Sequence, residues 1–86
     1  MKEIKMFMFE SCPHCAKARK IMSSLLESNP EYKEIPLVMI DEKLQPEVAD
    51  KYDYYYVPCF FVGGEKVCEG AVDEEKVKAV FEKAAE

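Results

Sequence analysis

Hydrophobic and polar residues follow two periods along this chain, one of two residues and one of about 3.6. Residues 3–9 (E-I-K-M-F-M-F) start with alternation and finish as a continuous apolar run, which predicts a central strand covered on both faces. From Pro13 onward, apolar residues recur at helical spacing until Asn29-Pro30 stops the pattern, so we expect an amphipathic helix of about four turns. Residues 35–40 (I-P-L-V-M-I) precede a charged cluster and predict a second buried strand.

The second half of the chain predicts a short helix, a hairpin and a last helix. Pro46 suits the first position of a helix that runs to about Tyr52. The runs C-F-F-V and E-K-V-C-E flank Gly63-Gly64, and two strands around a two-residue glycine loop form a hairpin. Asp73 is a suitable N-cap for a helix over residues 76–85, which carry one apolar stripe.

The predicted element order is therefore β-α-β-α-β-β-α. The strand-helix-strand opening predicts a right-handed parallel crossover, and the hairpin adds two antiparallel strands. We expect an α/β fold with a four-stranded mixed sheet and helices on both faces. Since the chain has 86 residues, we expect residues 1–86 to form a single domain.

Charge and hydropathy limit the partners of the protein. The formal net charge is -5 at pH 7, whereas binding to a polyanion needs clustered Lys and Arg, so we expect no nucleic-acid partner. No stretch approaches the roughly 20 apolar residues of a membrane span, and the apolar run at residues 6–9 is too short for the core of a signal peptide. We expect no membrane association, a cytoplasmic location and a monomer.

Residues 12–15, C-P-H-C, follow the first predicted strand and open the first predicted helix. In a cytoplasmic chain with an early β-α-β pattern, a C-x-x-C pair indicates a redox motif. With Cys12 as N-cap and Cys15 in the first turn, the two sulfurs can form a disulfide and separate again without backbone rearrangement. Pro13 fits the first helical position, where an N–H would have no partner. The helix N-terminus favours the thiolate form of Cys12.

His14, between the two cysteines, is predicted to tune Cys12. Its imidazole can donate a hydrogen bond to the thiolate or, when protonated, form an ion pair with it. The alternative is a solvated residue of the first turn. For the cysteines, the alternative is one half of a zinc site, so the rival to a redox enzyme is a metal-binding module that holds zinc or an iron-sulfur cluster. The redox chemistry itself needs no cofactor and no metal.

Three segments together resemble the thioredoxin superfamily, and the resemblance covers nearly the whole chain. They are C-P-H-C between a strand and a helix, A-D-K-Y-D-Y-Y-Y-V-P over residues 49–58, and G-G-E-K-V-C-E-G-A-V-D over residues 63–73. The resemblance implies the thioredoxin fold and a dithiol-disulfide oxidoreductase in which Cys12 attacks and Cys15 resolves. It also implies that Pro58 is cis with its ring against both cysteines, and that the Val57 backbone pairs with a bound substrate chain.

The length of the chain and the single strand before the motif are glutaredoxin-like. However, the segment Cys68-Glu69-Gly70-Ala71 stands where glutaredoxins hold the carboxylate of glutathione, and Glu69 would repel a carboxylate, so glutathione use stays open. The resemblance implies disulfide-containing proteins or small thiols as substrates, and recycling by a reductase or a low-molecular-weight thiol. The simplest interpretation of the tyrosines beside the proline is that they fill the core and its rim; the alternative is that one of them, Tyr55 or Tyr56, contacts the substrate.

Cys59 and Cys68 belong to the predicted hairpin. Counting outward from Gly63-Gly64 places Val62 opposite Glu65 and Cys59 opposite Cys68, as a non-hydrogen-bonded pair with Cα atoms about 4.5 Å apart. This separation just admits a disulfide, so the two cysteines are a candidate second redox pair. The alternatives are two buried free cysteines that act as small hydrophobic side chains and a metal site that uses all four cysteines.

Overall fold

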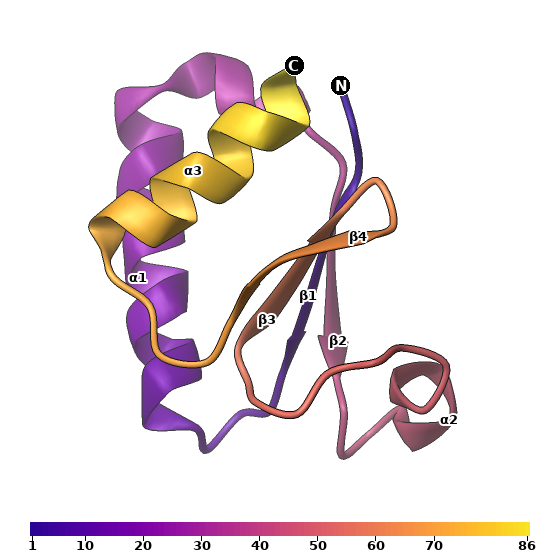
Figure 1. The fold of residues 1–86 in the computed structure, drawn as a ribbon. Coiled ribbons are helices and arrows are strands. Elements are labelled where there is room, and N and C mark those ends of the chain that lie inside the picture. Colours follow the sequence, from indigo (N-terminus) through magenta and orange to yellow (C-terminus); the bar gives the residue numbers. More distant parts are fainter.

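Four strands form one mixed sheet in the computed structural model, which describes residues 1–86 (Figure 1). The elements are, in chain order, β1 (Ile4–Met8), α1 (Pro13–Ser28), a 3-10 helix (Pro30–Glu34), β2 (Leu37–Asp41), α2 (Pro46–Ala49), β3 (Cys59–Val62), β4 (Glu65–Glu69) and α3 (Glu74–Ala85). The strand order is β2-β1-β3-β4. The pair β1–β2 is parallel, and the other two pairs are antiparallel. The predicted fold is confirmed, and the 3-10 helix is an addition to it.

The two long helices begin as the sequence predicts. Cys12 is the N-cap of α1, and this helix ends at Ser28 because Pro30 lacks the N–H that a further helical turn would need. Asp73 caps α3: its Oδ1 accepts a hydrogen bond from the backbone N–H of Lys76 at 2.8 Å. No helix is long and apolar enough to cross a membrane.

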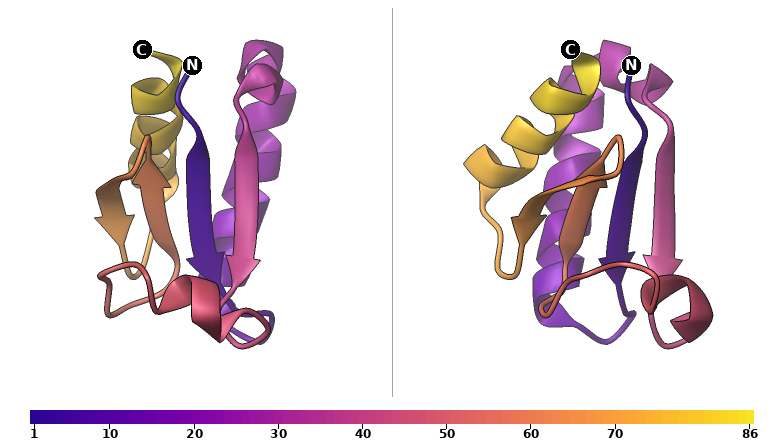
Figure 2. Two further views of the ribbon diagram at one scale, coloured as in Figure 1. Left: turned by 90° about the vertical axis from the view of Figure 1, so that its right-hand side faces the viewer. Right: turned by 45° about the vertical axis from the view of Figure 1, so that its right-hand side comes forward.

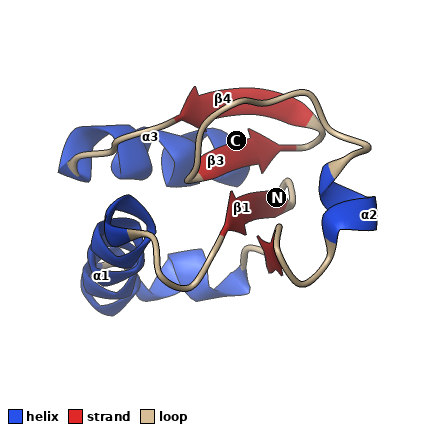
Figure 3. Cartoon of the chain, turned by 90° about the horizontal axis from the view of Figure 1, so that it is seen from below, coloured by secondary structure: helices blue, strands red, loops and turns tan.

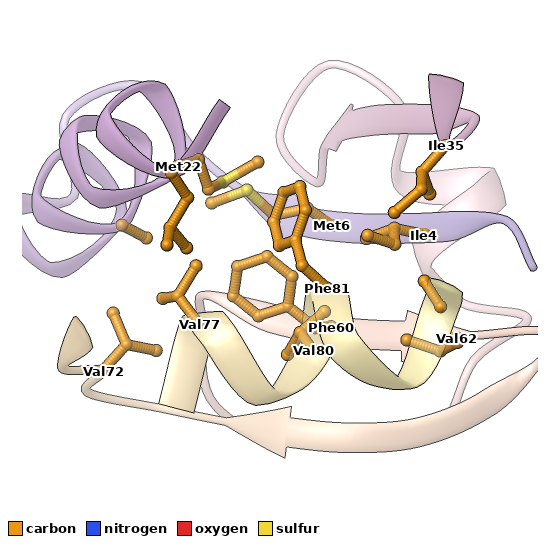
Figure 4. Packing of buried hydrophobic residues seen from close by; sticks show 13 residues of the cluster. Ile4, Met6, Met22, Ile35, Phe60, Val62, Val72, Val77, Val80 and Phe81 are labelled. Carbon is orange, nitrogen blue, oxygen red and sulfur yellow. The ribbon is translucent and has the colours of Figure 1, made fainter. Parts of the chain in front are cut away.

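The larger hydrophobic core lies between one face of the sheet and the helices α1 and α3 (Figures 1 and 4). Phe60 of β3 and Phe81 of α3 lie at its centre, next to Val77 and Val80 (Figure 4). The buried members of this core are Ile4, Met6, Ala18, Met22, Leu25, Ile35, Phe60, Val62, Val72, Val77, Val80, Phe81 and Ala84. Burial of the apolar faces of α1 and α3 against the sheet holds both helices in place.

A smaller core covers the opposite face of the sheet, next to α2. It contains Phe7, Ile40, Ala49, Cys59 and Phe61. The ring of Phe7 packs on Tyr52 and Tyr54, with ring centroids 4.8 Å and 4.9 Å apart. Because β1 has a core on each face, it is the central, doubly covered strand that the sequence predicts.

The two chain ends lie at one end of the sheet, and the loop that leads into α1 lies at the other (Figure 2). Lys2 ties the first residues to the last helix, since its backbone N–H donates to the carbonyl oxygen of Ala84 at 2.8 Å. Phe7 pairs with Cys59 across β1 and β3. The chain entering the C-P-H-C motif therefore lies beside the chain entering β3 (Figure 3).

The hairpin turn forms at the predicted glycines. Gly63 and Gly64 have φ angles of 57° and 87°, and a two-residue turn with both angles positive matches the right-handed twist of the flanking strands. Val62 and Glu65 pair on either side of it, as the sequence predicts. Glycine is suited to both positions because it has no Cβ to clash in the left-handed region.

Beyond the turn, the hairpin departs from the predicted register. Phe60 pairs with Cys68 and Cys59 pairs with Glu69. The predicted pairing of Cys59 with Cys68 is wrong, because Val67 is an extra residue in β4 that makes a β-bulge and moves every later residue by one position.

Two predicted elements differ in burial or extent. The strand predicted at residues 35–40 lies at the edge of the sheet, paired only with β1, so it is not buried throughout. Val38 and Met39 are 36% and 37% exposed because no further strand covers that edge. The short helix predicted to reach Tyr52 ends at Ala49, and single turns continue the chain beyond it.

Candidate active site

Cys12 and Cys15 lie one helical turn apart at the start of α1. Cys15 is fully buried, whereas Cys12 is 5% exposed. The sulfur of Cys12 accepts a hydrogen bond from the backbone N–H of Cys15 at 3.3 Å, which is the N-cap contact that the sequence predicts. Cys12 is therefore the sulfur that a substrate can reach, and Cys15 lies behind it.

The surroundings of the two thiols shift their pKa values in opposite directions. Burial raises the pKa of Cys12, but hydrogen bonds from the Cys15 thiol and from the backbone N–H groups of Cys15 and His14, with the charge of Arg19, outweigh it and lower the pKa. Burial, with the adjacent Cys12 as a further cause, raises the pKa of Cys15 to about 12. Of the two thiols, Cys12 is therefore the one that ionises first.

Arg19 is a site residue that the sequence analysis missed. It follows Cys15 by four residues, so the two side chains share one face of α1. Its guanidinium N–H donates to the sulfur of Met8 at 3.9 Å, which holds the side chain against the end of β1. The positive charge lowers the pKa of both cysteines. The spacing of four residues from Cys15 was the signal for this residue.

The side chain of His14 makes no hydrogen bond to Cys12 in the structure. The residue is exposed, and only its backbone N–H acts on the Cys12 sulfur. The first turn of α1 thus stabilises the thiolate through main-chain donors, in the way that helix N-termini bind anions generally.

Pro58 and its neighbours form the loop that leads into β3, the strand that pairs with the end of β1 before the cysteine motif. The Val57–Pro58 peptide bond is cis, and Pro58 is buried. No hydrogen bond within the chain uses the N–H or the C=O of Val57. Tyr55 and Tyr56, just before it, are 83% and 68% exposed. Within this loop, Val57 therefore has both backbone groups unpaired, directly before the strand that pairs with the end of β1.

Cys59 and Cys68 lie on opposite faces of the sheet. Cys59 belongs to the smaller core and Cys68 packs against the larger one. Both thiols are free; burial raises the pKa of Cys59 to about 12 and raises that of Cys68 as well. The cross-strand arrangement on which a second disulfide depends is absent, and no group of three His, Cys, Asp or Glu side chains is placed to hold a metal ion.

We predict that the rate at which iodoacetamide alkylates the native protein has its pH midpoint below about 8.5, the value expected for an ordinary thiol. The thiolate is the reactive species, so a lowered pKa of Cys12 moves the midpoint of the rate-against-pH curve to lower pH. Arg19→Gln should move the midpoint upward, because it removes a positive charge near the sulfur. Lys20→Gln, the same charge change at the next and exposed position, should not, and equal shifts in both variants would contradict a specific effect of Arg19.

Comparisons with known proteins agree on one superfamily. The family model described as Glutaredoxin matches residues 4–67. The chain is 26% identical to a thioredoxin from Methanocaldococcus jannaschii over 85 residues, which cover 96% of this chain and 98% of that protein.

Solved structures show the same fold. The solution structure of oxidised thioredoxin from Plasmodium falciparum has a TM-score of 0.74 and 20% identity, covering 99% of this chain and 82% of the other. Thioredoxin O1 from Arabidopsis thaliana in the oxidised state has a TM-score of 0.67 and 23% identity, covering 96% and 77%.

Proposed function

The chain belongs to the glutaredoxin family, within a superfamily of thiol-disulfide oxidoreductases, and from this premise we propose that it exchanges disulfides through Cys12 as nucleophile and Cys15 as resolving thiol. The observation that carries the proposal is the asymmetry of the pair. Cys12 is the more accessible of the two residues, at 5% exposed, and has the lowered pKa, whereas Cys15 is fully buried and has its pKa raised to about 12.

The reaction proceeds in two exchange steps. The Cys12 thiolate attacks one sulfur of the substrate disulfide, so that the substrate S–S bond breaks, a mixed disulfide forms and one substrate thiolate leaves. Cys15 then loses its proton and attacks the Cys12 sulfur, which releases the second substrate thiolate. Two electrons have passed to the substrate, and Cys12 and Cys15 are joined in a disulfide. The same steps in reverse oxidise a dithiol.

The first step itself prepares Cys15 for the second. The hydrogen bond to the Cys12 sulfur and the negative charge there both raise the pKa of Cys15. Once Cys12 is in a mixed disulfide it carries no charge, so this part of the effect disappears while that from burial remains. Cys15 thus becomes easier to deprotonate at the stage at which its thiolate is needed.

The substrate docks along Val57 and Tyr56. The free N–H and C=O of Val57 are placed to pair with an extended substrate segment in the manner of an added strand, and the exposed Tyr56 ring lies next to them. Pro58 closes the surface behind Cys12. Disulfide-containing proteins, or small disulfides, are the substrates that such a surface admits.

Recycling of the oxidised protein needs an external donor, a reductase or a low-molecular-weight thiol. Dithiol-disulfide cycling of this kind takes place in a reducing compartment, so we place the protein in the cytoplasm, as a monomer. The His14 ring makes no hydrogen bond to Cys12, and its role as a tuning residue stays a prediction.

The experiment that tests the function is a redox titration in defined dithiothreitol buffers, read by intact mass after alkylation under denaturing conditions. We expect one two-electron couple in which two of the four thiols are lost on oxidation. Cys59→Ala with Cys68→Ala should leave that couple unchanged, because neither residue takes part. Loss of all four thiols would show a second disulfide. In the native protein, thiols that resist alkylation until a chelator is added would indicate a metal-binding module instead of the enzyme.

A further inference from the structure

The bulge in β4 puts Lys66 and Glu69 on the same face of the sheet. Residues three apart on a regular strand point to opposite faces, but the extra residue Val67 changes the alternation between them. As a result, Lys66 Nζ lies 3.0 Å from Glu69 Oε1 in an ion pair. The departure from the predicted register thus creates a contact that a regular hairpin cannot make.

Glu69 also accepts hydrogen bonds from the loop that precedes Pro58. Its Oε2 accepts from the backbone N–H of Tyr55 and, at 2.9 Å, from that of Tyr56. Two consecutive N–H groups that converge on one oxygen form an anion-binding concavity. Here the chain fills the concavity with its own carboxylate, so Glu69, which the sequence suggested would repel a carboxylate, is itself the carboxylate bound there.

Two further contacts tie the same loop to the end of β4. Lys66 Nζ donates to the carbonyl oxygen of Asp53 at 3.3 Å. The backbone N–H of Gly70 donates to the carbonyl oxygen of Pro58 at 2.9 Å. The loop has no helix or strand of its own between Asp53 and Pro58. Its backbone groups therefore depend on β4 for partners.

Resting on the proposed function, we propose that Glu69 is a positioning residue that holds segment 55–58 so that Val57 faces a polypeptide substrate. Glu69 also occupies the N–H groups of Tyr55 and Tyr56, to which a carboxylate on a small disulfide would otherwise bind. The contacts leave Val57 as the residue of this stretch whose N–H and C=O are both free. A polypeptide needs only these groups, whereas a small anionic disulfide is denied the N–H groups of Tyr55 and Tyr56. The arrangement favours protein disulfides.

The charge on Glu69 is held through the working pH range. Hydrogen bonds from the N–H groups of Tyr55 and Tyr56, and the one from Lys66, lower the pKa of Glu69 to about 2. The groups that face this carboxylate are the Lys66 ammonium, the loop backbone and, from the paired position on β3, the Cys59 thiol, which its pKa of about 12 keeps neutral. Positioning by Glu69 is therefore expected to be independent of pH from about 4 upward, because a carboxyl with a pKa of about 2 is ionised there.

The test compares Glu69→Ala and Glu69→Gln with Glu65→Gln, which removes a charge from the same strand at an ion pair with Lys83 (2.9 Å). Turnover is measured with dithiothreitol as electron donor and with insulin, glutathione disulfide or the uncharged 2-hydroxyethyl disulfide as acceptor. For Glu69→Ala we expect KM for insulin to rise about three- to tenfold with kcat within about twofold, KM for glutathione disulfide to fall, and KM for the uncharged disulfide to stay unchanged. For Glu69→Gln we expect a smaller rise of KM for insulin, and for Glu65→Gln we expect no change in any KM.

Amide hydrogen exchange supplies a readout that does not depend on turnover. The N–H groups of Tyr55 and Tyr56 should exchange about tenfold faster or more in Glu69→Ala than in the wild type, while the pH midpoint of Cys12 alkylation stays constant. Faster exchange with unaltered KM values, or a change in kcat that follows a shifted Cys12 midpoint, would overturn the role of Glu69. A wild type that reduces none of the three disulfides would instead overturn the proposed function, whatever the exchange rates show.

Discussion

Cys12→Ser is expected to lose disulfide exchange almost completely, with kcat/KM for a protein disulfide lower by about a thousandfold or more. A serine hydroxyl does not ionise near neutral pH, so the hydrogen bonds and the helix N-terminus that lower the pKa of Cys12 have no thiolate to stabilise. Cys15 cannot substitute for it, because it is fully buried and its pKa is raised to about 12. The measurement is insulin reduction driven by dithiothreitol at pH 7.

Cys15→Ser is the matched variant, because it changes the same atom one helical turn away. It should retain the first attack and stop at the mixed disulfide, which then accumulates with one substrate molecule per enzyme and is seen by intact mass under denaturing, non-reducing conditions. The serine hydroxyl can still donate a hydrogen bond to the Cys12 sulfur, as the Cys15 thiol does. If Cys12→Ser traps substrate and Cys15→Ser is the inert variant, the two roles are reversed.

The central part of the site follows from the sequence alone. A strand that ends just before C-P-H-C and a helix that starts at Pro13 leave little choice about where Cys12 and Cys15 lie, since the i,i+3 spacing fixes their separation on one turn. The predicted N-cap contact of Cys12 is present. Local spacing along one helix is a strong constraint, and predictions that used only this constraint were confirmed.

Contacts between distant segments were harder to predict. The i,i+4 spacing puts Arg19 on the face of Cys15, but it does not show that the side chain is anchored to Met8 of β1. Glu69 was recognised only as a charge that would repel a carboxylate, because its partners, Tyr55 and Tyr56, are more than ten residues earlier in the chain. Sequence spacing carries no information about such pairs until the register of the hairpin is known.

In the fold, too, features that depend on neighbouring residues were predictable, whereas contacts between distant segments were not. Periodicity and the turn glycines predicted the elements and their order, because each depends on residues a few positions apart. The bulge at Val67 depends instead on how two side chains of β4 pack toward the larger core, which alternation cannot show. One extra residue is enough to remove the cross-strand pairing of Cys59 with Cys68, on which the candidate second disulfide depends. The edge position of β2 likewise follows from strand order, which the composition of the strand does not determine.

Phe60→Ala is expected to cost about 3–5 kcal/mol of the free energy of unfolding. Phe60 is fully buried at the centre of the larger core, between α3 and α1 (Figure 4), and its truncation both removes apolar burial and leaves a cavity that the sheet and two helices cannot close. A domain of this length has only roughly 4–13 kcal/mol of stability in total, so a large share of it is at stake. The measurement is urea unfolding followed by circular dichroism.

Tyr55→Ala is the control, because it removes an aromatic ring of similar size that is 83% exposed; it keeps the backbone N–H that donates to Glu69. We expect its free energy of unfolding to stay within about 0.5 kcal/mol of the wild type. If both variants lose the same amount, burial is not what decides the cost and the packing of β3 against α3 is wrong. Every group that acts on the Cys12 sulfur belongs to α1. If only Phe60→Ala is destabilised, and its remaining native fraction still forms the Cys12–Cys15 disulfide, then the core supports the site without determining the reactivity of the cysteines.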